Sequence, residues 1–127
     1  MARIRIAASL SFVSVVIHAN GKKLPLQRVL LDTGAARSTF RALDMAKLGL
    51  TIQDGDRVVF MRGIGGTEGY VPKAVDAVEV GDLVASPFTI QLGELNYGIP
   101  MNGILGLDFL LQTGAVIDLN ALEIRKG

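Results

Sequence analysis

Hydrophobic and polar positions alternate in the first part of the chain. Over much of residues 3–20, aliphatic and aromatic side chains recur at every second position. This period, with many β-branched residues, is typical of a strand that buries one face. Asn20-Gly21 then predicts a hairpin turn, because both residues tolerate a positive φ. The returning strand, residues 23–31, ends directly on Asp32.

A helical spacing follows this hairpin. Residues 38–50 predict a short helix that Ser38 or Thr39 caps and that Gly49 ends. The apolar residues expected on one face of this helix are Leu43, Ala46 and Leu50. Residues 107–114 predict about two further helical turns close to the end of the chain.

The other segments predict strands. Residues 57–61 and 68–71 form an expected hairpin whose tip, residues 63–66, is rich in glycine and carries one exposed aliphatic side chain. Residues 74–95 contain two or three short strands, and residues 115–126 a last hairpin. The order of elements is therefore mainly β with two short helices.

The length and composition are those of one domain. The 127 residues lie within the usual domain size, and half of them are hydrophobic, which is enough for a sizeable core. We find no repeat, low-complexity stretch or linker that would divide the chain. We therefore expect a single all-β domain over residues 1–127.

The charge balance argues against several partners. Thirteen basic and 12 acidic side chains give a formal net charge of +1, which favours neither nucleic acid nor an acidic membrane surface. Trp is absent, so no base-stacking platform is expected. No apolar run approaches the ~20 residues of a membrane span. The absence of cysteine and of an evident signal peptide favours the cytoplasm, and leaves open an N-terminal anchor that has been removed.

The residue types present also limit the chemistry. The chain has no cysteine and a single histidine, His18. Disulfides, thiolate nucleophiles and cysteine-based metal sites are excluded, and no histidine pair can bind zinc. A Ser-His-Asp triad would have to use His18, which is expected on the surface of the first hairpin. We expect no metal and no other cofactor, so a hydrolase would have to work with carboxylates and water.

Asp32 raises the main chemical question. A carboxylate at the end of an apolar run is costly unless hydrogen bonds or charges compensate it. Either Asp32 is a turn residue that has reached the surface, or it is held in place for chemistry. The residues that follow it, Thr33 and Gly34, suit a tight turn in both cases.

Three segments, taken in order, give the sequence a resemblance to a known family. They are Leu30-Leu31-Asp32-Thr33-Gly34-Ala35, Gly63-Ile64-Gly65-Gly66 and Ile104-Leu105-Gly106. Together they resemble the retropepsin-like aspartic proteases: the first matches the family's catalytic motif without a gap, the second its flap, and the third its closing segment. The resemblance covers nearly the whole chain, and the helix after Phe40 is closer to bacterial members than to the compact viral ones.

The resemblance implies a closed β-barrel that forms one lobe of an aspartic endopeptidase. A two-lobed protease carries two Asp-Thr-Gly motifs, whereas this chain has one. The implied active form is therefore a C2 homodimer with Asp32 of each copy at the axis. Thr33 would brace the two loops, Gly34 would allow the tight turn, and Ala35 and Arg37 would contact a peptide substrate.

The same resemblance assigns roles to the other two segments. Gly63, Gly65 and Gly66 would let a flap approach the substrate closely and move, and Ile64 would make an apolar contact at its tip. The support beneath the Asp32 loop would come from Ile104, Leu105 and Gly106.

The chain departs from the retroviral members at two positions. Ala36 takes the place of an acidic residue, and Leu107 that of an arginine, so the charged network of those enzymes cannot form and the interface is expected to be more apolar or the dimer weaker. Arg37 and Arg41 either form a solvated face or select acidic substrate side chains.

Two alternatives stay open: a catalytically silent peptide-binding or dimerisation module of this fold, and a generic β-barrel whose Asp-Thr-Gly is a plain turn.

Overall fold

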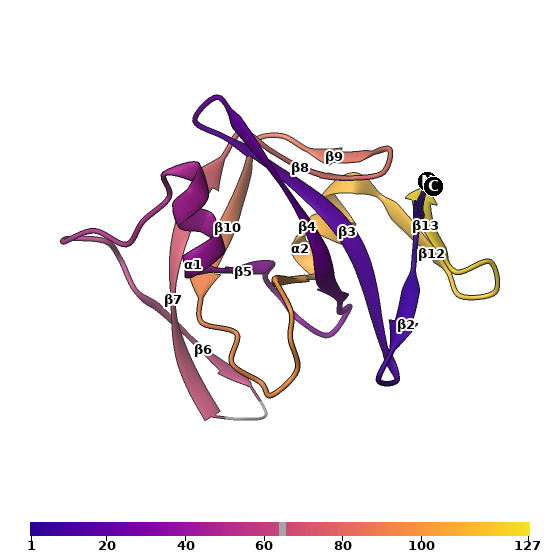
Figure 1. The fold of residues 1–127 in the computed structure, drawn as a ribbon, viewed down its shortest axis with the longest axis horizontal. Coiled ribbons are helices and arrows are strands. Elements are labelled where there is room, and N and C mark those ends of the chain that lie inside the picture. Colours follow the sequence, from indigo (N-terminus) through magenta and orange to yellow (C-terminus); the bar gives the residue numbers. More distant parts are fainter. Residues whose placement is uncertain (64–65) are drawn as a thin grey trace.

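The computed structural model describes residues 1–63 and 66–127, and strands dominate it (Figure 1). The strands are β1 (Ala2–Arg3), β2 (Arg5–Ala7), β3 (Leu10–Ala19), β4 (Lys22–Leu31), β5 (Thr39–Arg41), β6 (Val59–Gly63), β7 (Gly66–Val75), β8 (Ala77–Val80), β9 (Leu83–Ala85), β10 (Phe88–Gly93), β11 (Gly103–Leu105), β12 (Ala115–Asp118) and β13 (Glu123–Lys126). The helices are α1 (Ala42–Met45), the 3-10 helix η1 (Ala46–Leu48) and α2 (Leu107–Thr113). The expected class, mainly β with two short helices, is therefore confirmed.

Two sheets are formed. The large sheet has ten strands in the order β6-β7-β10-β5-β11-β4-β3-β8-β9, with β2 paired to β3, and the small sheet has the order β1-β13-β12. In the middle of the large sheet, β11 runs parallel to β4, with Leu105 beside Leu31, and antiparallel to β5, with Ile104 beside Thr39. A strand from the C-terminal part of the chain, β11, thus lies beside β4, the strand that leads into Asp32.

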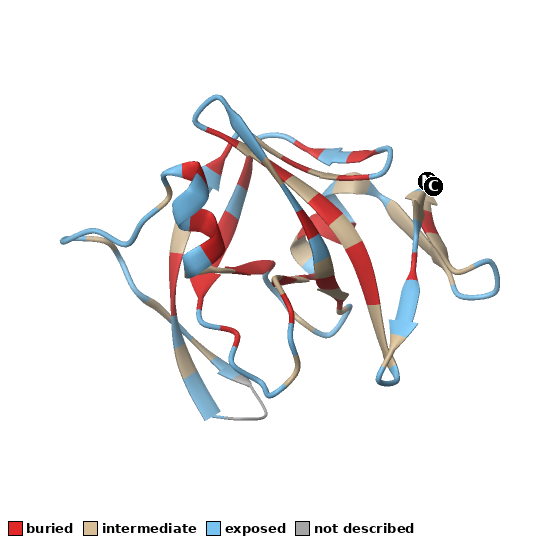
Figure 2. Cartoon of the chain, viewed as in Figure 1, coloured by how far each residue is buried: buried red, intermediate tan, exposed pale blue. Residues whose placement is uncertain are grey.

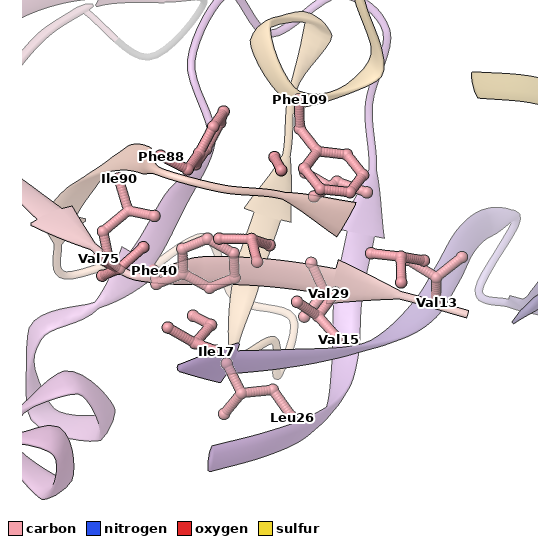
Figure 3. Close-up of a cluster of buried hydrophobic side chains, with 14 of the residues drawn as sticks. Val13, Val15, Ile17, Leu26, Val29, Phe40, Val75, Phe88, Ile90 and Phe109 are labelled. Carbon is pink, nitrogen blue, oxygen red and sulfur yellow. The ribbon is translucent and has the colours of Figure 1, made fainter. Parts of the chain in front are cut away.

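One face of the large sheet is buried in the main hydrophobic core. Buried and half-buried positions alternate along much of β3, as period-two patterning requires (Figure 2). The ring of Phe109 on α2 meets that of Phe88 edge to face, with centroids 5.9 Å apart (Figure 3). Burying a side chain of this size contributes about 1.5–3 kcal/mol, so Phe109 holds α2 against the sheet.

Several local predictions are confirmed. Asn20 and Gly21 have φ values of 54° and 72° and join β3 to β4 in a hairpin. Gly49, with φ 75°, ends the first helical segment. The second helix, α2, has the predicted position and length, and β12 and β13 form the last hairpin.

The prediction of a closed β-barrel is wrong, because the large sheet is open. Its path ends at β6 on one side and β9 on the other, and these two strands do not pair within residues 1–63 and 66–127. β9 has three residues and packs against α2, while β6 and the part of β7 before Val71 extend beyond the pairing of β7 with β10 (Figure 1). Phe60 of β6 is exposed, whereas Tyr70 and Val71 of β7 are buried.

The predicted helix over residues 38–50 is also wrong in its first part. Thr39 begins β5, which pairs with both β10 and β11, so the helix cannot start there. α1 follows Arg41 without a side-chain cap. The shifted start changes the buried face: Leu43 and Ala46 are exposed, whereas the buried positions are Asp44, Met45 and Leu48.

The N-terminal segment turns where one alternating strand was expected. Ala8 and Ser9 have φ values of 52° and 61°, which fold β2 back onto β3. β1 pairs with β13, so the two ends of the chain lie together (Figure 1). Within residues 1–63 and 66–127, every helix is too short or too polar to cross a bilayer.

Candidate active site

Asp32 lies where β4 ends and extends its hydrogen-bond ladder by one residue. Its backbone N–H donates to the carbonyl oxygen of Leu105 at 3.0 Å. Leu31 is buried in the main core, so the alternation of a strand turns Asp32 to the opposite face, together with Leu30. The carboxylate is half-buried. The apolar run therefore ends on a side chain that leaves the core.

A tight turn holds this carboxylate. The Gly34 N–H donates to Asp32 Oδ1 at 2.9 Å, and the Ala35 N–H to the Asp32 carbonyl oxygen at 3.2 Å. A Cβ atom on Gly34 would lie 3.2 Å from Asp32 Oδ1, which is closer than most such contacts. Thr33 is exposed at the outside of the turn. The structure thus brings Asp32, Thr33, Gly34 and Ala35 into one loop at the surface.

The segment Ile104-Leu105-Gly106 lies directly beside this loop. The Leu107 N–H donates to the Ala35 carbonyl oxygen at 2.7 Å. A Cβ atom on Gly106 would lie 2.8 Å from the carbonyl oxygens of Ala35 and Arg37, so only glycine fits without displacing the loop. Ile104 pairs with Leu30 on one side and with Thr39 on the other.

Ser38 and Asp108 connect the end of the Asp32 loop to α2, and sequence reasoning missed this contact. Ser38 is fully buried; its Oγ donates to Asp108 Oδ1 at 2.8 Å and accepts from the Gly106 N–H at 2.9 Å. The Ser38 N–H donates to Asp108 Oδ2 at 3.0 Å. Asp108 also accepts from the Phe109 N–H at 2.8 Å, in the first turn of α2, where the helix dipole favours a negative charge. An acidic residue in the first turn of a helix was the only signal available.

Arg37 and Arg41 lie in different surroundings. Arg37 is exposed. Arg41 forms a bidentate pair with Asp44, with Nε–Oδ2 and Nη2–Oδ1 distances of 2.9 and 3.1 Å, and the hydrogen bond and the charge of Asp44 raise the pKa of Arg41. Burial alone would raise the pKa of Asp44, but bonds from Arg41 and Asn102, and the charges of Arg41 and Lys47, hold it below its usual value. Of the two arginines, Arg37 keeps its guanidinium at the surface.

The glycine-rich segment lies at the end of the β6–β7 hairpin. Gly63 pairs with Gly66, whose φ is 111°, while Ile64 and Gly65 lie outside the described residues. Figure 1 shows this hairpin extending beside residues 94–101, the loop that follows β10.

Three side chains link β7 to that loop. The hydroxyls of Tyr70 and Tyr97 both donate to Glu68 Oε2, at 2.5 and 2.8 Å, and the two hydroxyl oxygens lie 3.1 Å apart. These bonds hold the pKa of Glu68 below its usual value, while burial and the contact with Glu68 raise the pKa of Tyr70. The base of the hairpin is thereby attached to residues 94–101.

The remaining candidate residue lies elsewhere. His18 Nε2 is 2.9 Å from Glu79 Oε1, on the β3–β8 pair, and about a third of its side chain is exposed. A surface cavity of about 450 Å³ lies between Arg41 and residues 94–101. Neither feature includes Asp32.

Comparisons with known proteins identify a similar solved structure and a matching protein family. The fold resembles a solved retropepsin-like aspartic protease from Rickettsia conorii, with a TM-score of 0.61 and 18% sequence identity over 93% of this chain and 83% of that one. The fold is therefore retropepsin-like. A family model described as aspartyl protease matches residues 13–109, a range that contains Asp32 and Gly106. The chain belongs to the aspartyl protease family. None of the curated proteins matches it.

Proposed function

We propose that this protein is an aspartic endopeptidase whose active centre uses Asp32 from two copies of the chain. The observation that carries the proposal is the Asp32 turn: a half-buried carboxylate accepts a hydrogen bond from Gly34 N–H, and Gly106 lies directly against the loop. Membership of the aspartyl protease family supports the same chemistry.

Peptide hydrolysis by water needs a base that activates the water and an acid that protonates the carbonyl oxygen. Two carboxylates a few ångströms apart supply both, because like charges at that distance cannot both ionise and one proton is shared. One chain supplies a single Asp-Thr-Gly. A second copy related by a two-fold axis would bring its own Asp32 to the first.

The exposed Thr33 is available for contact with that second copy, where it would brace the two loops. Gly34 would keep the turn of each loop tight. Ala35 and Arg37 would contact the peptide at the rim of the site. The dimer itself is part of this proposal.

The β6–β7 hairpin is proposed as the flap. An extended peptide needs main-chain partners above it, which a hairpin can provide, and closing it excludes bulk water. Gly63, Gly65 and Gly66 would allow close approach, and Ile64 would supply an apolar contact. The attachment of Tyr70 to Tyr97 through Glu68 supports movement of the tip about a fixed base.

The proposed substrate is an extended peptide with apolar residues flanking the bond that is cut. Leu30 and Ile104, which share the face of Asp32, are half-buried aliphatic side chains that suit such residues.

The decisive experiment replaces Asp32. Asp32→Asn keeps the size of the side chain but cannot share the proton, so we expect cleavage of a peptide library to be abolished while the circular dichroism spectrum and sedimentation coefficient stay unchanged. Asp54→Asn, at an exposed position, is the matched control and should cleave like the wild type. Cleavage that survives in a clean Asp32→Ala preparation would overturn the mechanism.

A second candidate is a catalytically silent peptide-binding or dimerisation module. Ala36 and Leu107 favour it, because neither side chain can supply the charges that stabilise dimers of the retroviral enzymes. A monomer at tens of micromolar, with no pepstatin-sensitive cleavage between acidic and neutral pH, would favour this candidate. Sedimentation and a cleavage assay on the same sample distinguish the two candidates.

A further inference from the structure

A row of four side chains crosses the large sheet on the face that carries Asp32. Leu30 pairs with Ile104, Ile104 with Thr39, and Thr39 with Gln91, on β4, β11, β5 and β10 in turn. Residues paired directly across neighbouring strands project from the same face, and Asp32, two residues after Leu30, shares that face. The row therefore begins beside the carboxylate and leads away from it.

The chemistry of the row changes along its length. Leu30 and Ile104 are aliphatic and pack against a small apolar cluster of Phe12, Leu95 and Met101, whereas Thr39 and Gln91 are polar and buried. Neighbouring strands are about 4.8 Å apart, so Thr39 and Gln91 lie about 5 and 10 Å beyond Ile104. These distances bracket the ~6.6 Å between alternate side chains of an extended peptide.

Gln91 has a hydrogen-bonding group that its surroundings do not use. Its side chain is buried, and Oε1 has no hydrogen-bond partner among the described residues. The residue paired with it on β7 is Pro72, which has no N–H to donate. Leaving a buried acceptor unpaired disfavours the unliganded chain, and a methionine would fill the same space without that penalty.

We infer that Gln91 determines substrate specificity by accepting a hydrogen bond from the substrate side chain that lies two residues along from the one next to the cleaved bond, since alternate side chains of an extended peptide lie on the same side. Leu30 and Ile104 would receive the apolar side chain next to that bond. A peptide that crosses the strands meets the row in this order. This inference rests on the proposed function, and the two-fold axis would place a Gln91 at each end of the cleft.

The test compares peptides that differ only in having threonine or valine, which have the same shape, two residues along from the residue next to the cleaved bond. The wild type should cleave the threonine peptide about fivefold faster in kcat/KM, the effect of one net hydrogen bond. Gln91→Met should remove this preference, so that kcat/KM for the two peptides agrees within about twofold. Thr89→Val, on the same strand and exposed, is the matched control and should keep the preference.

A binding measurement separates failure of this inference from failure of the proposed function. Peptides from a random library are selected on immobilised Asp32→Asn protein and on the Asp32→Asn, Gln91→Met double variant, without any turnover. Enrichment of Ser, Thr, Asn or Gln two positions from an apolar residue, if it is lost in the double variant, supports the inference even if the wild type cleaves nothing. Equal enrichment on both proteins, or no bound peptide, overturns it. A higher melting temperature of Gln91→Met with an unchanged threonine preference also overturns it.

Discussion

Ser38 is fully buried and lies six residues after Asp32, at the point where the loop enters β5. Its hydroxyl accepts from the Gly106 N–H and donates to Asp108, so one oxygen atom joins the loop, β11 and α2. Asp32 is therefore positioned partly by a residue that makes no contact with the carboxylate itself.

Ser38→Ala removes both hydroxyl contacts and leaves the Gly106 N–H buried without its partner. We expect a loss of about 1–3 kcal/mol of unfolding free energy, measured by urea denaturation, and a lower kcat/KM because the loop is no longer fixed. Ser86→Ala is the matched control: the Ser86 Oγ donates to the Asp76 carbonyl oxygen at an exposed site, so activity should not change. Equal effects of the two variants on kcat/KM would contradict a positioning role for Ser38.

At the scale of whole elements, the sequence pattern correctly predicted those elements that are determined by residues close together in the chain. The alternation along β3, the Asn20-Gly21 turn and α2 are encoded within a few neighbouring residues. The start of the first helix was predicted wrongly because Thr39 is held in β5 by strands from the other half of the chain.

The candidate site likewise has one part that could be predicted from the sequence and one part that could not. The turn from Asp32 to Ala35 could be predicted because it is contiguous in sequence and its hydrogen bonds are local. The contact between Ser38 and Asp108, and the position of Gln91 beside Thr39, depend on sheet register between distant segments. Periodicity gives the face of a residue on its own strand and leaves its partner on the next strand undetermined.

The short helix α1 is fixed by an ionic contact rather than by a cap. Asp44 is buried and accepts from Arg41 and from Asn102 Nδ2, which lies 3.3 Å away in the segment before β11. Because these bonds outweigh burial, the pKa of Asp44 is below its usual value of 3.8 in the folded protein. A lowered folded pKa stabilises the fold above the unfolded pKa, and this contribution is lost as the pH falls through the folded value.

We therefore expect Asp44→Asn to be about 1–2 kcal/mol less stable than the wild type at pH 7, since hydrogen bonds to a charged group are lost. Below about pH 4 the wild type loses the same contribution, and the difference should shrink. Urea midpoints of both proteins at pH 7 and pH 3 measure it. Comparing the two proteins cancels the titration of other carboxylates such as Glu68. A difference that is constant with pH would show that the charge of Asp44 does not stabilise α1.

At the scale of the whole molecule, the ends of the chain already pair with each other. β1 and β13 lie side by side within one copy, and β12 completes their small sheet. The proposed dimer would bring two Asp32 loops together, so surfaces next to that loop are the ones a second copy would cover. Leu107, at the start of α2, is 39% exposed, and its N–H donates to the Ala35 carbonyl oxygen. It is an apolar side chain beside the loop, at the position where the retroviral resemblance leads one to expect an arginine.

Leu107→Glu puts a charge on this surface, and burying an unpaired charge against a partner is strongly unfavourable. The dimer dissociation constant from sedimentation equilibrium should rise by about tenfold or more, and activity per chain should fall steeply on dilution, because one chain holds only half of the proposed active centre. Leu43→Glu is the matched control, since Leu43 is 76% exposed on α1, and it should change neither quantity. If Leu107→Glu dimerises and cleaves like the wild type, the two Asp32 loops meet without this surface and the proposed interface is wrong.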